Sequence, residues 1–338
     1  MEIFEFDKQL AKTFVKDFDI PLYVIDEPTF FYQLEMYGFI EKWKSFVDAV
    51  NSFPGNIIEV QKEAFYNSRQ HVEDEIINEI KNSEAYKNFN DNVLPKEFTV
   101  PVSFPSDKLS EKMGNEKVYL SIDLKSANIQ ALHYFDKDIT FGENTWDGVV
   151  HKVNGHNSMS DYIISSKHVR QVVMGMLNPK RAVTIEKHMM GLIYKLMVDN
   201  GYDFMIESFN NDEIVFDISD EDFVYLSLEE SEKIVSLIRE QLGFDVHLKI
   251  FSTRAFRLLN KRNNDITQQF ILRIYDDGKT QVKGVPGYLY GIVFKLLRDM
   301  TITSSDRHFI NDNMDCMIVD DFFLVDNDKN QIDLSDLV

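Results

Sequence analysis

Two adjacent carboxylates, Asp212 and Glu213, lie between two short apolar runs in the segment ESFNNDEIVFDI, residues 207–218. A third carboxylate, Asp123, comes near the end of the apolar segment KVYLSIDL, residues 117–124. Carboxylates that meet at one place repel one another unless a cation or a proton lies between them. Their oxygens suit Mg²⁺ or Mn²⁺, which bind few protein carboxylates and complete their coordination with phosphate and water. The three residues are therefore a candidate metal site; the alternative is an ordinary hairpin turn.

The elements that would bring these carboxylates together are predicted from the periodicity of residues 117–251. Short alternating apolar runs predict strands, and apolar residues at helical spacing with capping residues at the ends predict helices. The predicted strands are 117–124, 204–209, 214–218 and 246–251, and the predicted helices are 161–177, 178–200 and 227–243. With the helical segment before the hairpin taken as one element, the order is β–α–β–β–α–β, typical of an antiparallel sheet with helices on one face. In this α+β fold the first strand lies beside one arm of the hairpin, so Asp123 is expected to approach Asp212 and Glu213.

Two of these segments resemble motifs of a known enzyme class. SIDLKSANIQAL, residues 121–132, is similar to polymerase motif A, in which an aspartate ends the first strand of the palm domain. NNDEIVFDI, residues 210–218, resembles the HDEIVFE-type motif of the family A nucleic-acid polymerases, the bacterial DNA polymerase I kind. The D-x-x-S spacing from Asp123 to Ser126 is also similar to family B. The resemblance covers these motifs and the element order, and it implies a polymerase-like palm.

The resemblance also implies a reaction, two-metal nucleotidyl transfer, with Asp123 and Asp212 as metal ligands and Glu213 beside them. Two cations can stabilise both the attacking 3′-oxygen and the departing pyrophosphate. The chain departs from the family at two positions: Asn211 stands where family A usually has His, and Asn128 stands where a bulky sugar-selecting residue is expected. The implied partners are a nucleic acid primer and template and nucleoside triphosphates.

Charge is unevenly distributed along the chain. The whole sequence has 36 Lys and Arg against 56 Asp and Glu, a formal net charge of -20. Residues 167–195 nevertheless hold 6 bases and 1 acid, and residues 254–298 hold 9 bases and 3 acids. Two basic surfaces on an otherwise acidic molecule would localise a polyanion to one groove. The alternative is that the basic residues are simply scattered unevenly.

Several basic and polar residues are candidates for binding phosphate. Cations in the first turn of a helix oppose the helix dipole, whereas an anion bound there is favoured. The candidate phosphate-binding residues are Lys180 and Arg181, in the first turn of the helix that begins at Asn178, together with Arg170, Lys187, Ser126 and Asn128. The candidate nucleic-acid-binding residues are Arg254 and, in a predicted hairpin over 268–291, Lys279 and Lys283. Basic residues interleaved with aromatic ones can follow a nucleic acid backbone and stack on bases; the alternative is an ordinary solvated surface.

The remainder of the chain is predicted to flank the palm. Apolar residues at helical spacing over 30–50 and 72–89 predict a mainly helical N-terminal domain, residues 1–115, which ends after a proline-rich connection. The palm-like domain is predicted over 116–310, with inserted helices at about 140–200, and an acidic tail over 311–338.

The tail is predicted to contain an edge strand in MIVDDFFLVD, residues 317–326. Its last eight residues have no obvious partner within the chain. They are expected either to fray, to fold over the basic groove, or to dock onto a replication or transcription assembly.

The amino-acid composition also limits the kinds of protein that the chain could be. The single cysteine, Cys316, excludes an intramolecular disulfide and a cysteine-based zinc cluster, and it fits a reducing cytoplasm. No secretory signal and no membrane-spanning run is expected. The residue content fits a cytoplasmic protein, and the resemblance implies an enzyme that uses Mg²⁺ or Mn²⁺ for nucleotidyl transfer on a primer and template. The alternatives are a non-catalytic palm-like scaffold or nucleic-acid-binding subunit, and a nucleotide cyclase.

Overall fold

In the computed structural model of the protein, the chain forms two compact units. Unit 1 comprises residues 1–92, 136–179 and 287–318, and unit 2 comprises residues 93–135, 180–286 and 319–338. The structure describes residues 6–333 except 19, 21–26, 54–57, 106–116, 220–227, 262, 264–265, 277–279, 284–286, 297–299, 312–313, 319–321 and 327–330. Within the described ranges, no helix combines the length and the apolar character needed to cross a bilayer.

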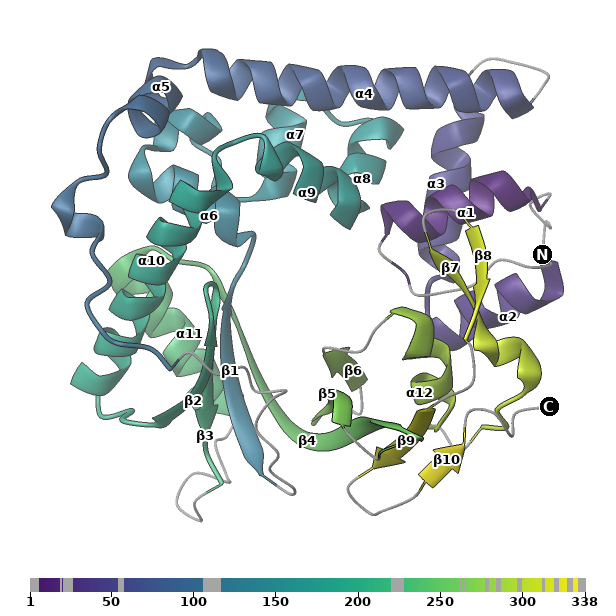
Figure 1. The fold of residues 1–338 in the computed structure, drawn as a ribbon. Coiled ribbons are helices and arrows are strands. Elements are labelled where there is room, and N and C mark those ends of the chain that lie inside the picture. The colour runs from purple at the N-terminus through teal and green to yellow at the C-terminus, as the bar shows by residue number, and fades with distance from the viewer. Residues whose placement is uncertain are drawn as a thin grey trace. The chain divides into compact units, whose positions relative to one another are not determined.

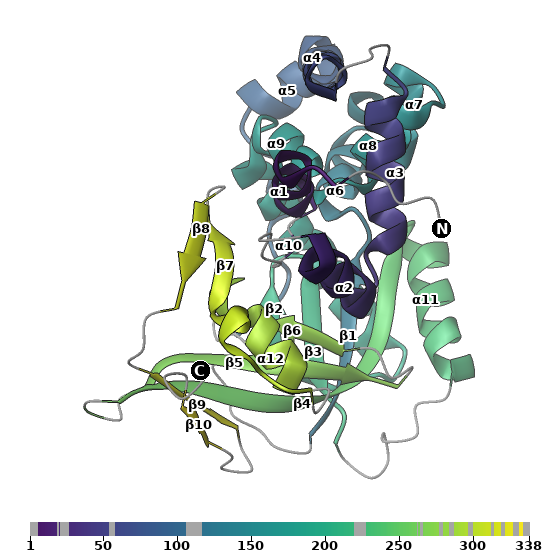
Figure 2. The same cartoon turned by 90° about the vertical axis from the view of Figure 1, so that its right-hand side faces the viewer.

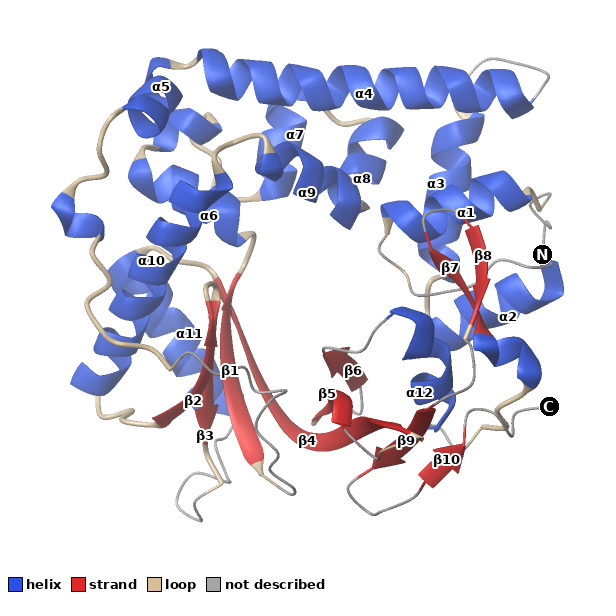
Figure 3. Cartoon of the chain, viewed as in Figure 1, coloured by secondary structure: helices blue, strands red, loops and turns tan. Residues whose placement is uncertain are grey.

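Unit 1 is mainly helical (Figure 3). Its helices are α1 (Lys8–Asp17), α2 (Glu27–Tyr37), α3 (Ile40–Asn51), α4 (Ile58–Asn82), α5 (Glu84–Asp91), α7 (Trp146–Asn154), α8 (Ser158–Ser165), α9 (Lys167–Gly175) and α12 (Tyr290–Leu296), and its hairpin is β7 (His308–Asn311) and β8 (Met314–Met317). Its core is rich in aromatic side chains: Phe14, Trp43, Phe46 and Tyr162 are at most 1% exposed. The ring centroids of Phe14 and Trp43 are 5.2 Å apart, and those of Phe46 and Tyr162 are 5.7 Å apart. These are favourable packing distances for aromatic rings, so the apolar faces of the helices pack together to form the core of unit 1.

Local backbone breaks divide two of the predicted helical segments. The pattern over residues 30–50 forms α2 and α3, because Gly38 between them has a φ of 73°, which a glycine adopts without strain. The helix predicted over 161–177 forms α8 and α9. Ser166 between them is extended, and its hydroxyl accepts a hydrogen bond from the Val169 N–H and so caps α9.

Unit 2 contains an antiparallel sheet with helices, so the α+β fold class is confirmed. The strands are β1 (Val118–Leu124), β2 (Met205–Asn210), β3 (Glu213–Asp217), β4 (Val246–Asn260), β5 (Ile266–Tyr275), β6 (Thr280–Lys283), β9 (Phe322–Asp326) and β10 (Gln331–Asp333), and the helices are α6 (Ala127–Phe135), α10 (Pro179–Asp199) and α11 (Leu228–Leu242). The strand order is β10-β9-β4-β1-β3-β2, and β5 pairs with β4 and β6. The first strand therefore lies between β4 and β3, one arm of the hairpin, as predicted. Strand β4 is longer than predicted and continues past β1 to pair with β5 and β9 (Figure 2).

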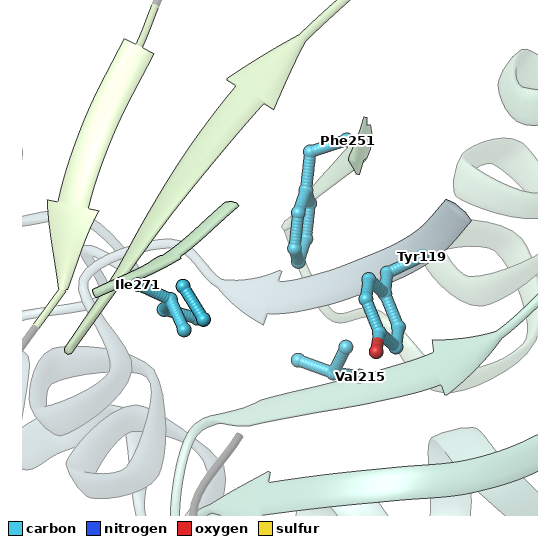
Figure 4. Packing of buried hydrophobic residues seen from close by; sticks show 5 residues of the cluster. Tyr119, Val215, Phe251 and Ile271 are labelled. Atoms are coloured by element: carbon cyan, nitrogen blue, oxygen red, sulfur yellow. The ribbon is translucent and has the colours of Figure 1, made fainter. Parts of the chain in front are cut away.

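The two faces of this sheet differ. Helices α10 and α11 lie along one face (Figure 1), where the ring of Tyr194 on α10 stacks on Phe216 of β3. Successive residues of a strand point to opposite faces. On the other face, an apolar cluster joins β1, β3, β4 and β5 and consists of Tyr119, Val215, Phe251, Ala255 and Ile271 (Figure 4). Asp123 is four residues beyond Tyr119, so it lies on this second face, away from the helices.

The contacts group the chain differently from the predicted division into residues 1–115, 116–310 and 311–338. The expected boundary near residue 115 lies outside the described residues. The helices predicted as an insertion at about 140–200 are divided between the units: residues 136–179 belong to unit 1 and residues from 180 onward to unit 2. Residues 287–318 also belong to unit 1.

The C-terminal segment contributes strands to both units. The stretch 317–326 was predicted as one strand, but β8 ends at Met317 and β9 begins at Phe322. Strand β10 pairs with β9, with Gln331 opposite Val325. The expectation that the last eight residues have no partner within the chain is therefore wrong for residues 331–333; residues 334–338 lie outside the described part.

Candidate active site

The predicted carboxylates meet at one end of the unit 2 sheet. Asp123 of β1 is paired in register with Glu213 of β3. The N–H of Leu124 donates to the carbonyl of Asp212 at 2.9 Å, which joins the end of β1 to the β2–β3 turn. Asn211 allows this tight turn because its φ is 47°, a left-handed conformation that Asn tolerates better than most residues. The predicted approach of Asp123 to Asp212 and Glu213 is thus confirmed at the level of the backbone.

The connection between β1 and α6, which follows Asp123, is held in place by the buried side-chain amide of Gln130. Gln130 on α6 is 3% exposed and uses both ends of its side chain. Its Nε2 donates to the carbonyl of Asp245 at 2.7 Å, and its Oε1 accepts from the Asp245 N–H at 2.8 Å. The Lys125 N–H also donates to the Asp245 carbonyl, at 2.9 Å. Because both ends of the amide are used, the β1–α6 connection is held against the start of β4.

Glu213 forms a buried ion pair with Arg273. Arg273 of β5 donates from Nη1 to Oε1 at 2.5 Å and from Nη2 to Oε2 at 3.1 Å, and the Ser121 hydroxyl donates to Oε1 at 2.8 Å. The guanidinium also lies 4.5 Å from the ring centroid of Phe251. Burial lowers the pKa of Arg273, but the hydrogen bond to Glu213 and its charge outweigh burial, so the pKa is raised. The geometry makes Glu213 an anchor of the sheet, and its partner Arg273 was not predicted from the sequence.

A fourth carboxylate, Glu186 on α10, lies near Asp212. It is 3% exposed, and the side-chain amide of Asn128 donates to its Oε1. Burial, followed by the charge of Asp212, raises the pKa of Glu186 to about 7. Asn128, predicted to bind phosphate, therefore holds a carboxylate. Glu186 was not predicted, although a signal was present: it is the one acid in residues 167–195, and it lies on the buried face of α10.

The raised pKa of Glu186 predicts a specific pH dependence of stability. Its pKa lies near 4.5 in the unfolded chain and at about 7 in the folded one. The folded state therefore binds more protons between these values, and stability falls as pH rises through that window. Glu186→Gln should consequently stabilise the protein at pH 8 relative to pH 4.5 by roughly 2–3 kcal/mol in urea unfolding. Exposed Glu240→Gln on α11 is the control, and an equal effect of Glu186→Gln at both pH values would refute the assignment.

The predicted phosphate-binding residues are only partly brought together. Helix α10 begins at Pro179, so Lys180 and Arg181 lie in its first turn, as predicted, and Lys187 lies further along the same helix. Ser126 precedes α6, and its carbonyl accepts from the Ile129 N–H at 2.8 Å. Arg170 lies on α9 in unit 1 and not in unit 2 with the others.

The predicted nucleic-acid-binding residues do not gather at Asp123 in the described part of the chain. Arg254 is on β4, on the face opposite Thr253, and its guanidinium lies 5.5 Å from the ring centroid of Phe256. Thr253 shares its face with Asp123, so strand alternation places Arg254 on the other side of the sheet. The hairpin is confirmed as β5 and β6, but Lys279 and the side chain of Lys283 lie outside what the structure describes.

The donors at this end of the sheet fit a hard divalent cation. Within the described residues, no group of three or more His, Cys, Asp or Glu side chains is arranged to hold a metal. Mg²⁺ does not require one, because it is often bound by one or two carboxylates plus substrate phosphates. Asp123 and Asp212 offer two carboxylates at the end of the sheet. The negative charge of Asp212 raises the pKa of Glu186, and a cation bound at Asp212 would neutralise this charge.

Comparisons of the chain with family models, curated proteins and solved structures found no match.

Proposed function

We propose that the chain is a metal-dependent nucleotidyltransferase with a polymerase-like palm, acting on a nucleic acid primer and template. The observation that carries the proposal is the register of β1 with β3, in which Asp123 lies opposite Glu213. In the same register the Leu124 N–H donates a hydrogen bond to the Asp212 carbonyl. Support also comes from the strand order β4-β1-β3-β2, with helices on the face away from Asp123. Carboxylates grouped at the end of a sheet, where they can hold a divalent cation, suit phosphoryl transfer.

Each residue has a distinct role in this proposal. Asp123 and Asp212 hold Mg²⁺ or Mn²⁺, which when bound neutralises the charge developing on the attacking and departing oxygens. Arg273 keeps Glu213 in place and so fixes the β2–β3 turn against β1. Glu186, whose pKa is raised to about 7, limits the negative charge beside Asp212 when it is protonated. Lys180 and Arg181, at the start of α10, bind the triphosphate.

A non-catalytic scaffold is the second candidate. It is favoured by one observation: the motif carboxylate of Glu213 is fully engaged by Arg273 and Ser121, as expected for a structural element. A nucleotide cyclase would use the same pair of metal carboxylates and is a third candidate.

One assay separates the three. The purified chain is incubated with labelled nucleoside triphosphates and Mg²⁺ or Mn²⁺, with a primed template, with an unprimed template, and without nucleic acid. The proposal predicts metal-dependent extension of a nucleic acid strand. A cyclic nucleotide formed without template would establish the cyclase. Nucleic acid binding with neither product would favour the scaffold and contradict the proposal.

A further inference from the structure

Basic side chains lie beside Asp123 at the end of the unit 2 sheet. His247 of β4 is paired in register with Asp123, and Lys249 is paired with Ser121. Cross-strand partners in an antiparallel pair have Cβ atoms about 4.5–5.5 Å apart and project from the same face. His247 and Lys249 are exposed. Lys125 follows Asp123 by two residues, and its N–H donates to the carbonyl of Asp245, the residue before β4.

These three residues form a group, which we call the basic triad: Lys125, His247 and Lys249. They are close enough to influence one another, since burial and the charges of Lys125 and Lys249 lower the pKa of His247. In the described part of the chain none of the triad forms an ion pair with an acid. Other cations of the same unit are paired: Lys117 with Asp217 at 2.5 Å, and Arg239 with Asp245 at 2.6 Å.

An aromatic ring fixes one member of the triad. The Nζ of Lys249 lies 5.5 Å from the ring centroid of Tyr275, a cation–π distance. The Tyr275 hydroxyl donates to Gln281 Oε1 at 2.7 Å, so the ring is held by β6. A lysine fixed in this way loses less side-chain freedom when it binds an anion.

We propose that the basic triad binds the phosphate groups of a polynucleotide or of a nucleoside triphosphate next to the carboxylates. His247 and Lys249 share the face of Asp123, and Lys125 is near enough to lower the pKa of His247. In the described part of the chain these three groups form no ion pair with an acid, which suits an anion with several oxygens. Asp123 repels a plain anion, but a phosphate can bridge the triad and a cation held by the carboxylates. The identity of the ligand rests on the proposed nucleotidyl transfer; the binding of phosphate by the triad does not.

The test measures binding, so that it is independent of activity. A labelled single-stranded oligonucleotide is titrated with the full chain by fluorescence anisotropy, with and without Mg²⁺, and inorganic triphosphate is titrated in parallel by calorimetry. The test variant is Lys125→Gln/Lys249→Gln. The control variant is Lys96→Gln/Lys195→Gln, which removes two exposed lysines of the same unit. His247→Gln is a third variant, for the case that the double variant does not fold.

The triad variant should bind the oligonucleotide at least about tenfold more weakly than the control at low salt. The slope of log affinity against log salt should fall by about 1.4, because each lost contact to a single strand removes about 0.7. Loss of oligonucleotide binding identifies a nucleic acid backbone, and loss of triphosphate binding alone identifies the nucleotide. Affinities equal to those of the control for both ligands would overturn the inference.

The outcome can be told apart from failure of the proposed function. If no nucleotide is incorporated but the triad variant still loses phosphate binding, the triad stands and the enzyme assignment fails. If incorporation occurs and the triad variant binds like the control, the enzyme stands and the triad fails.

Discussion

Asp123→Asn and Asp212→Asn are each expected to lower nucleotide incorporation by about a thousandfold or more, while the chain stays folded. In the proposed site, each substitution replaces a negatively charged metal ligand by a neutral amide of nearly the same volume. A bound cation stabilises the transition state by several kcal/mol, and each 1.36 kcal/mol corresponds to a factor of ten in rate. The measurement is the initial rate of primer extension at saturating Mg²⁺ or Mn²⁺.

The control for this prediction is Asp245→Asn. Asp245 lies at the same end of the sheet, but its carboxylate pairs with exposed Arg239 at 2.6 Å, and the proposal gives it no metal-binding role. It should therefore keep most of the activity. Circular dichroism checks that all variants are folded. Full activity in folded Asp123→Asn or Asp212→Asn would contradict the metal assignment.

The second large effect is expected on stability. Arg273→Met should lower the free energy of unfolding by about 3–5 kcal/mol, because it leaves the Glu213 carboxylate buried without its counter-charge. The bidentate bond, with distances of 2.5 and 3.1 Å, and the burial of both residues support this magnitude. The double variant Arg273→Met/Glu213→Leu should recover most of the loss, because the uncompensated charge is then absent.

A matched exposed ion pair is the comparison. Arg239 also donates two hydrogen bonds, from Nε at 2.9 Å and from Nη2 at 2.6 Å, but both go to Oδ1 of Asp245 and the Arg239 side chain is 58% exposed. Arg239→Met should therefore cost less than about 1 kcal/mol. Urea unfolding measures all three variants. If Arg273→Met and Arg239→Met had equal effects, or if the double variant were no more stable than Arg273→Met, the pair would not anchor the site.

The local elements of unit 2 could be predicted because their signals are local. Alternation defines β1 and the hairpin, and the Asn178-Pro179 start and the Gly201 stop define α10. The pairing of β1 with β3 follows from the order of elements, since few topologies accept this order. The convergence of Asp123 and Asp212 could therefore be predicted without knowing any distance.

The partners of the carboxylates could not be predicted. Arg273 is 60 residues from Glu213 in the chain, and their contact depends on β4 extending far enough to carry β5. The strand pattern around Arg273 fits a surface residue as well as a buried one. Glu186 and Asn128 meet because the start of α6 lies beside α10, a packing detail that periodicity does not specify.

The division of the chain into two units also could not be predicted from the sequence. The helices over 136–179 carry apolar faces that could cover either the sheet or other helices, and hydrophobic spacing is the same for both. The contacts place them with the N-terminal helices.

The most direct test of the central claim is Mn²⁺ binding, measured by electron paramagnetic resonance in the presence of a nucleoside triphosphate. The wild-type chain is predicted to bind Mn²⁺, and Asp123→Asn and Asp212→Asn to weaken this binding by at least about tenfold, with Asp245→Asn unchanged. Equal Mn²⁺ affinity in the wild type and in both carboxylate variants would contradict a metal site at the end of this sheet.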